Sequence, residues 1–134
     1  MINRELINPQ SIVVVGGSNN VHKPGGRLVR NLLDGKYKGE LYVVNAKEDD
    51  VQGLKSYHSV HDIPETELAI ISIPGPACPE AVDVLAKQKN VKAFIVISAG
   101  FGEETHEGAI LEEQMLKSIN EAGASLIGPN CIGL

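Results

Sequence analysis

Five short apolar runs are spaced along the chain, and each ends close to a glycine, a proline or an asparagine. Many of their residues are β-branched, and apolar and polar positions do not alternate within them. Short runs without alternation are typical of strands that are buried on both faces of a parallel sheet. The runs are residues 12–15, 41–44, 68–73, 93–97 and 125–127.

Three stretches between these runs carry apolar residues at intervals of three or four positions, which predicts amphipathic helices. The first follows Gly25 and stops near Gly35, the second begins near Pro79, and the third closes at Gly123. The apolar positions are Leu28, Leu32 and Leu33 in the first, Ala81, Val82 and Leu85 in the second, and Ile110, Leu111, Met115, Ile119 and Ala122 in the third.

Strands that alternate with helices predict an α/β domain with a parallel sheet and right-handed crossovers. We expect a doubly wound sheet of five strands in the order 3-2-1-4-5, with helices on both faces. Residues 49–66 are less regular, and we expect a loop or a short helix at residues 62–65, before the third strand. In this topology ligands bind beyond the carboxyl ends of the strands, near the reversal between the first and fourth strands. The residues that follow each strand are therefore the candidates for a site.

Length, composition and charge narrow the class of protein. The chain has 134 residues, of which 43% are hydrophobic and 22% charged, a balance typical of one folded domain. Its 12 basic and 17 acidic residues give a net charge of −5, so we do not expect general nucleic-acid binding, which needs a basic surface. No apolar run approaches the roughly 18 residues of a membrane span, and the first residues lack a signal-peptide core. We therefore expect a cytoplasmic protein without a membrane partner.

The loop after the first predicted strand has the composition of an anion site. Glycines at positions 16, 25 and 26 let a phosphate approach the backbone, and the following helix directs free N–H groups and its positive end towards it. Ser18 can add a hydroxyl donor and Lys23 a charge. The spacing is neither G-x-G-x-x-G nor that of a P-loop, so a glycine-rich turn without a ligand is the alternative.

The end of the second strand favours a phosphorylated ribose over an unmodified one. Asn45 stands where a site for NAD usually has an acid, and Lys47 follows two residues later. A cation at this place suits a ribose that carries a phosphate. The alternative is that Lys47 is an ordinary surface lysine.

The ends of the other strands carry apolar and small residues. Ile73 and Pro74 form a rim that could flank an adenine or a thin pantetheine-like arm, although a turn that stops the strand is the alternative. Ser98 and Ala99 leave room for a ligand, and Asn130 offers an amide.

Neither cysteine nor histidine spacing points to catalysis or to a metal. Two cysteines do not make a disulfide scaffold, and no histidine is paired with Cys131 by a known motif, so we expect a buried structural cysteine there. His58 and His61 are three residues apart, but no cluster of further ligands completes a metal site.

Five segments taken in order resemble the N-terminal CoA-binding domain of NDP-forming acyl-CoA synthetases, the family related to the α subunit of succinyl-CoA synthetase. The resemblance covers nearly the whole chain and implies a Rossmann-like domain that binds coenzyme A. The segments are residues 8–12, 16–26, 44–47, 97–103 and 126–134.

The resemblance also implies roles for individual residues. Lys47 would face the phosphorylated ribose of CoA, and Asn130 would lie near its thiol end. The residues implied to hold the phosphates are Gly16, Ser18, Gly25 and Gly26, and those implied to contact CoA further along are Ile97, Ser98 and Ala99.

In that family, acyl-CoA, phosphate and NDP are interconverted with free acid, CoA and NTP through an acyl phosphate and a phosphorylated histidine. The histidine belongs to a later domain, and the nucleotide sits in an ATP-grasp portion; neither fits into 134 residues already filled by five strand–helix units. The resemblance therefore implies that residues 1–134 bind CoA but are inactive alone. ATP or ADP and Mg²⁺ belong to the complete enzyme, whose other domains or subunit are the expected partners, with a homo-oligomer as a further possibility.

Two other functions fit the same pattern. One is a stand-alone sensor that binds CoA or a nucleotide without chemistry, and the other is an NAD(H)-binding module of the redox-sensing type. The chain stops at Leu134, shortly after the last predicted strand, which favours a piece of a longer ligase. The acid that is activated and the choice between ADP and GDP are not encoded in this segment.

Overall fold

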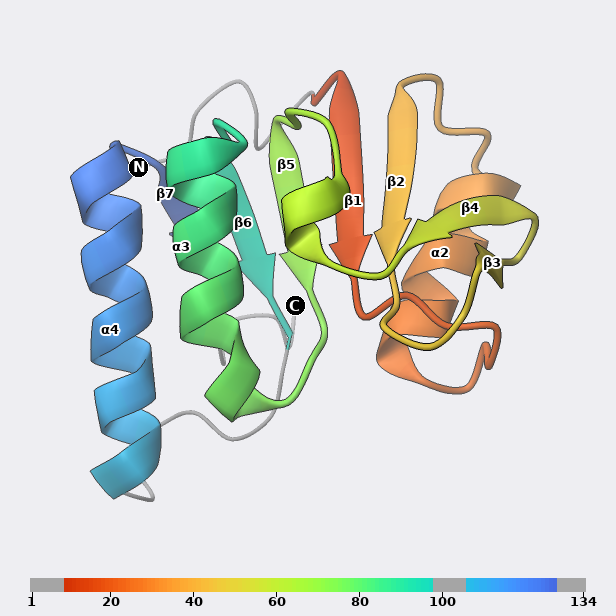
Figure 1. Ribbon diagram of the computed structural model, residues 1–134. Helices are drawn as coiled ribbons and strands as arrows, with labels where there is room; N and C mark the ends of the chain where they lie inside the picture. Colours follow the sequence, from red (N-terminus) through yellow and green to blue (C-terminus); the bar gives the residue numbers. More distant parts are fainter. Residues whose placement is uncertain (1–8, 98–105, 128–134) are drawn as a thin grey trace.

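Residues 9–97 and 106–127, the part of the chain that the computed structural model describes, form one sheet with helices packed on both faces (Figure 1). The strand order across the sheet is β3-β4-β2-β1-β5-β6-β7. The strands are β1 (Ser11–Val15), β2 (Glu40–Val44), β3 (Asp50–Val51), β4 (Leu54–Tyr57), β5 (Leu68–Ile71), β6 (Ala93–Val96) and β7 (Ser125–Ile127). The helices are α2 (Pro24–Asp34), α3 (Cys78–Gln88) and α4 (His106–Ala122), with 3-10 turns η1 (Val60–Asp62) and η2 (Gly75–Ala77).

The central strands are parallel and end at the same level. Val15, the last residue of β1, stands opposite Val44 of β2 and Ile71 of β5. Backbone hydrogen bonds continue this register by one residue, from Gly16 N–H to the Val44 carbonyl at 2.8 Å and from Ser72 N–H to the Val15 carbonyl at 2.8 Å. The segments that follow these three strands therefore meet at one edge of the sheet.

The predicted strand order is wrong for the five runs named above. The third run, β5, pairs with β1 rather than with β2. The place beside β2 belongs to β4, which the sequence did not predict because only one of its four residues is buried. When β4 is counted as the third parallel strand, the six parallel strands follow the doubly wound order 3-2-1-4-5-6. The reversal consequently lies between β1 and β5, not between β1 and the fourth predicted strand.

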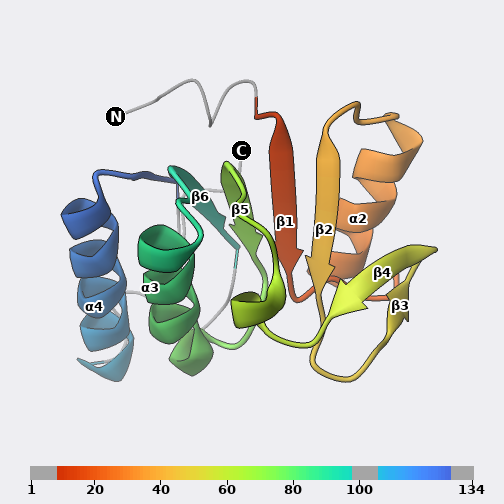
Figure 2. The same ribbon diagram turned by 45° about the horizontal axis from the view of Figure 1, so that its top comes forward.

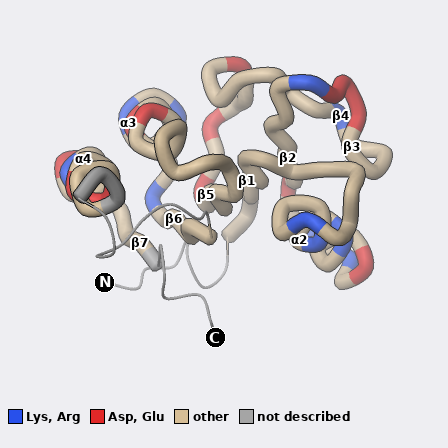
Figure 3. The backbone as a smooth tube through the Cα atoms, turned by 90° about the horizontal axis from the view of Figure 1, so that it is seen from below, with Lys and Arg blue, Asp and Glu red and all other residues tan. Residues whose placement is uncertain are grey.

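The helices divide between the two faces as the sequence predicts. Figures 2 and 3 show α2 on one face and α3 with α4 on the other. Alternate residues of β1 serve the two layers: Val14 packs in the cluster that contains Val29 of α2, whereas Val13 packs with Leu85 of α3 and Met115 of α4. Burial on both faces is the physical reason why the strands are continuous apolar runs.

Candidate functional site

A cavity of about 630 Å³ opens where β1, β2 and β5 end, at the carboxyl edge onto which Figure 3 looks. This edge, at the reversal of strand order, is where doubly wound sheets bind ligands. The cavity is lined by Val15, Gly16, Ser18, Lys23, Pro24, Gly25, Val44, Asn45, Ala46, Lys47, His58, Val60, Ser72, Ile73, Pro74 and Ala81.

Two glycines let the loop after β1 fold closely against the sheet. Gly16 has a φ of +93°, and a Cβ there would overlap the carbonyl of Ser72. A Cβ at Gly25 would overlap the carbonyl of Gly16, so the start of α2 lies directly over the end of β1. Lys23, at the N-cap of α2, makes no capping hydrogen bond with its side chain. The first turn of α2 therefore presents the N–H groups and positive dipole end that suit an anion.

Asn45 joins the end of β2 to this loop. Its Nδ2 donates to the Gly17 carbonyl at 2.8 Å, while its Oδ1 accepts from the N–H groups of Lys47 at 2.8 Å and Glu48 at 3.1 Å. This is the local turn that asparagine side chains stabilise. Asn45 lines the cavity as predicted, but its amide mainly shapes the turn that carries Lys47.

Ammonium, imidazole and hydroxyl groups from three segments share the cavity. Lys23 and Lys47 are exposed, and His58, which is half-exposed, has its Nε2 2.8 Å from an Asp49 carboxylate oxygen. The Ser18 hydroxyl accepts from Asn20 N–H at 3.0 Å and can still donate its hydrogen. Groups of this kind can bind phosphate at more than one point of a ligand.

The opposite wall of the cavity is apolar. Ile73 and Pro74 follow β5, Val60 lies in η1, and Ala81 is the residue of α3 that lines the cavity. Such a wall suits a flat base or an aliphatic arm rather than a charged group. The site thus combines an anion-receiving side with an apolar side.

Most predicted site residues line this cavity. They are Gly16, Ser18, Lys23, Gly25, Asn45, Lys47, Ile73 and Pro74. Gly26 does not line it but is buried in the first turn of α2, and Ile97 continues β6 by donating its N–H to the Ile71 carbonyl at 3.0 Å. Ser98, Ala99 and Asn130, like Cys131, lie outside the described residues.

The segment after β4 also lines the cavity, which the sequence did not predict. His58 and Val60 line the cavity because β4 pairs with β2 and ends at the same edge. The available signal was the pair Gln52-Gly53, a two-residue turn that precedes the strand and has φ values of +51° and +89°. Turn residues rather than an apolar run marked this strand.

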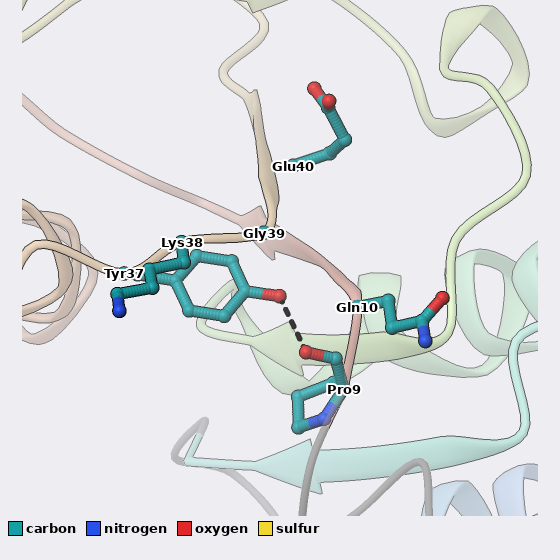
Figure 4. A pocket seen from close by; sticks show the side chains of 6 residues that line it. All are labelled: Pro9, Gln10, Tyr37, Lys38, Gly39 and Glu40. Carbon is teal, nitrogen blue, oxygen red and sulfur yellow. Dashed lines mark hydrogen bonds between the residues drawn. The ribbon is translucent and has the colours of Figure 1, made fainter.

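A second cavity lies at the amino edge of the sheet, between the residues that precede β1 and β2 (Figure 4). The Tyr37 hydroxyl crosses it and donates to the Pro9 carbonyl at 2.8 Å. Burial, and then the charges of Glu67 and Glu40, raise the pKa of Tyr37, so this hydroxyl stays protonated and keeps its hydrogen bond. The contact is a structural tie, and the cavity has no cluster of cations.

Residues 9–97 and 106–127 contain neither a candidate metal site nor a helix that could span a membrane. No group of three or more His, Cys, Asp or Glu side chains could hold a metal ion there. None of the helices described is long and apolar enough to cross a membrane.

Comparison with known proteins identifies relatives among CoA ligases. The family described as CoA binding domain matches residues 10–134. The ADP-forming acetate–CoA ligase II of Archaeoglobus fulgidus is 39% identical over 132 residues, which cover 98% of this chain and 20% of that protein. The α subunit of the ADP-forming acetate–CoA ligase II of Pyrococcus furiosus is 39% identical over 131 residues, covering 96% of this chain and 28% of that subunit.

Solved structures agree with these relatives. A crystal structure of a Pyrococcus horikoshii protein superposes with a TM-score of 0.87 at 40% identity, over 97% of this chain and 30% of that one. The apo acetyl-coenzyme A synthetase 1 of Candidatus Korarchaeum cryptofilum gives a TM-score of 0.83 at 34% identity, over 95% of this chain and 27% of that one. The chain spans less than a third of each of these relatives. It belongs to the CoA binding domain family, in the form found in ADP-forming acyl-CoA synthetases.

Proposed function

We propose that this chain is the CoA-binding domain of an NDP-forming acyl-CoA synthetase and that it binds CoA in the cavity at the carboxyl edge of the sheet. One observation carries the proposal: the glycine-rich loop, the exposed Lys47 and the apolar wall of Ile73 and Pro74 surround a single cavity. CoA has matching parts, namely a pyrophosphate, a 3′-phosphate on its ribose, and an adenine with a pantetheine arm.

The proposed roles follow from this match. The loop between Gly16 and Gly25 and the start of α2 hold the pyrophosphate, with Ser18 donating its hydroxyl. Lys47 holds the 3′-phosphate, because it projects from the end of β2, where dinucleotide folds place the ribose. The wall of Ile73 and Pro74 packs against the adenine or the arm. Asn45 keeps the Lys47 turn and the loop at a fixed separation.

CoA supplies the thiol that carries the acyl group. The residues of this chain bind and orient CoA and keep its phosphates paired with donors. We propose that the phosphorylated histidine, the site for NTP or NDP and the Mg²⁺ site belong to other domains or to a second subunit. The ADP-forming ligases among the relatives support this arrangement, since this chain matches only a fraction of their length.

Calorimetric titration with CoA, dephospho-CoA and NAD tests the choice of ligand. We expect CoA to bind most tightly and dephospho-CoA more weakly, because dephospho-CoA lacks the 3′-phosphate. Tighter binding of NAD than of CoA would show that the assignment is wrong and would favour the dinucleotide module.

Lys47→Ala tests the role of this cation. Hydrogen bonds to charged groups contribute about 1.5–3 kcal/mol, so we expect the Kd for CoA to rise about tenfold or more. Dephospho-CoA should bind nearly as before, so the difference between the two ligands should narrow. Lys38→Ala, at the exposed amino edge, is the matched control and should change neither Kd. Equal losses for both ligands in Lys47→Ala would contradict the role.

A further inference from the structure

The turn of the β3–β4 hairpin rests on the glycine-rich loop through the side chain of Gln52. Its Nε2 donates to two carbonyls, that of Ser18 in the loop at 2.8 Å and that of Gly26 in the first turn of α2 at 2.9 Å. These carbonyls lie at the two ends of the part of the loop that crosses from β1 to α2. A single amide therefore ties both ends together.

Asn19 completes the contact from the side of the loop. Its Oδ1 accepts from Gln52 N–H at 2.7 Å, and its Nδ2 donates to the Asp50 carbonyl at 2.9 Å. Gln52 adopts a φ of +51°, a conformation that residues with a Cβ seldom take. The hairpin and the loop thus hold one another through four side-chain hydrogen bonds.

The orientation of the Gln52 amide is determined by its two acceptors. Because Nε2 faces Ser18 and Gly26, Oε1 is buried and has no hydrogen-bond partner within residues 9–97 and 106–127. A buried carbonyl oxygen without a partner destabilises the fold. This orientation gives the Nε2 group two acceptors, the carbonyls of Ser18 and Gly26.

We propose that Gln52 is a positioning residue for CoA binding, which holds residues 18–26 in the shape that receives the phosphates. Gln52 is not among the residues that line the cavity, so it acts through the loop rather than by touching the ligand. Ordering a flexible loop on binding costs conformational entropy and lowers the affinity. A loop that is already ordered in the free protein avoids this cost. This inference rests on the proposed function, since it concerns the same site.

Within the loop itself, the other hydrogen bonds are local. Asn20 N–H donates to the Ser18 hydroxyl at 3.0 Å, His22 N–H to Asn20 Oδ1 at 3.0 Å, and Lys23 N–H to the Asn20 carbonyl at 3.1 Å. Local bonds of this kind give the loop a shape but do not fix its place relative to the sheet. Two side chains from outside the loop fix its position: Asn45 binds the Gly17 carbonyl, and Gln52 binds the Ser18 carbonyl.

Gln52→Met is the decisive variant, because methionine has a similar length, adds no charge and removes both donors. We expect the Kd values for CoA and dephospho-CoA to rise by the same factor, about tenfold, because both ligands carry the pyrophosphate. The ratio of the two Kd values should stay at the wild-type value, in contrast to Lys47→Ala. Gln88→Met, the same change at an exposed position at the end of α3, is the matched control.

Hydrogen exchange on the free protein gives a readout that needs no ligand. In Gln52→Met the amides of Asn20, His22 and Lys23 should exchange faster, while those of β1 and β5 should keep their wild-type rates. If Gln52→Met does not fold, Asn19→Ala replaces it. That variant removes the reciprocal pair of bonds but leaves Nε2 of Gln52 in place, and we expect the same pattern with a smaller increase in Kd.

The failures of the two proposals are distinguishable. If wild-type protein binds CoA and both variants bind it equally well, the inference about Gln52 is overturned and the proposed function stands. A change in the ratio of the Kd values in Gln52→Met also overturns it, because the effect would then reach the 3′-phosphate. If wild-type protein does not bind CoA, the proposed function fails and so does the link to affinity. Hydrogen exchange then still decides whether Gln52 orders the loop.

Discussion

At the scale of single residues, the shape of the site depends on two places where no side chain fits. Gly16 and Gly25 bring the loop, the end of β5 and the start of α2 so close together that a Cβ at either position would overlap a backbone carbonyl. Backbone atoms cannot move aside as the end of a flexible side chain can. Substitution at either glycine must therefore displace the loop itself.

Gly25→Ala tests this dependence. We expect a loss of about 1–3 kcal/mol in the free energy of unfolding, typical of overpacking, and a loss of CoA binding beyond what the lower stability explains. Urea denaturation and calorimetry measure the two effects. Gly123→Ala is the control: its φ of +69° is strained for alanine, but nothing lies near the added Cβ. It should cost about 1 kcal/mol and leave CoA binding intact. Equal CoA affinities for Gly25→Ala and the wild type would contradict the account.

Asn45 shows the difference between where a side chain lies and which groups it contacts. Its position after β2 marks it as a site residue, and it does line the cavity. Its hydrogen bonds to Gly17, Lys47 and Glu48, however, run to the backbone around it. Sequence position indicates where a side chain lies, whereas its partners depend on the neighbouring segments.

At the scale of elements, a polar cluster on the outside of the sheet joins α3 to α4. Lys87 lies 3.0 Å from Asp83 on its own helix and 2.9 Å from Glu121 on α4. The hydroxyl of Ser118, a buried residue of α4, donates to Asp83 at 2.9 Å. Hydrogen bonds from Lys87 and then from Ser118 lower the pKa of the Asp83 carboxyl. The hydrogen bond to Lys87 likewise lowers the pKa of Glu121.

The lowered pKa of Asp83 predicts a pH-dependent contribution to stability. A carboxyl whose pKa is lower in the folded than in the unfolded state stabilises the fold above its ordinary value of 3.8, and the stabilisation is lost as the pH falls through the folded-state pKa. Asp83→Asn should therefore lower the midpoint of thermal unfolding at pH 7. The difference in unfolding midpoint between Asp83→Asn and the wild type should become smaller as the pH falls from about 5 to about 2.

Thermal unfolding followed by circular dichroism at several pH values measures this effect. Asp34→Asn is a suitable control, since Asp34 pairs with Arg30 on the same helix at 3.2 Å and, in the part of the chain that the structure describes, forms no ion pair with a second element. A difference between Asp83→Asn and the wild type that is constant over the whole pH range would contradict the argument.

Strand β4 illustrates why some elements were predicted and another was not. The predicted strands β1, β2, β5 and β6 each have at least two buried residues, and burial requires apolar side chains, whereas only one residue of β4 is buried. β4 lies beside β2 with the hairpin partner β3 on its other side, and its residues Lys55 and Tyr57 form a cation–π contact 4.9 Å long. β4 is held by backbone hydrogen bonds to β2 and β3, and these bonds do not require apolar side chains.

At the scale of the whole molecule, the chain corresponds to only part of the length of its relatives. It covers 20% of the Archaeoglobus fulgidus ligase and 28% of the Pyrococcus furiosus α subunit. The cavity holds groups that suit phosphates, and under the proposed function the phosphorylated histidine belongs to another domain or subunit. Binding and chemistry are therefore expected to be separable.

We expect the 134-residue chain to bind CoA without catalysing thioester cleavage. Incubation with acetyl-CoA, ADP, phosphate and Mg²⁺, followed by assay of free thiol, should show no release above the rate without protein. The same preparation should bind CoA in the calorimeter, which controls for folding. Thiol release that requires both ADP and phosphate and is lost in Lys47→Ala would contradict this expectation.

The sequence by itself determined the α/β class, the three helices, five of the strands and half of the residues that line the cavity. These features follow from local patterns, because burial on both faces demands apolar runs and a loop that folds closely against the sheet demands glycine. Only the tertiary structure decided that β5 pairs with β1, that β4 completes the sheet, and that Gln52 and Asn19 meet across the loop. Strands and turns from the whole chain compete for the same hydrogen-bonding partners. Which distant segments pair therefore cannot be predicted from a local pattern of residues.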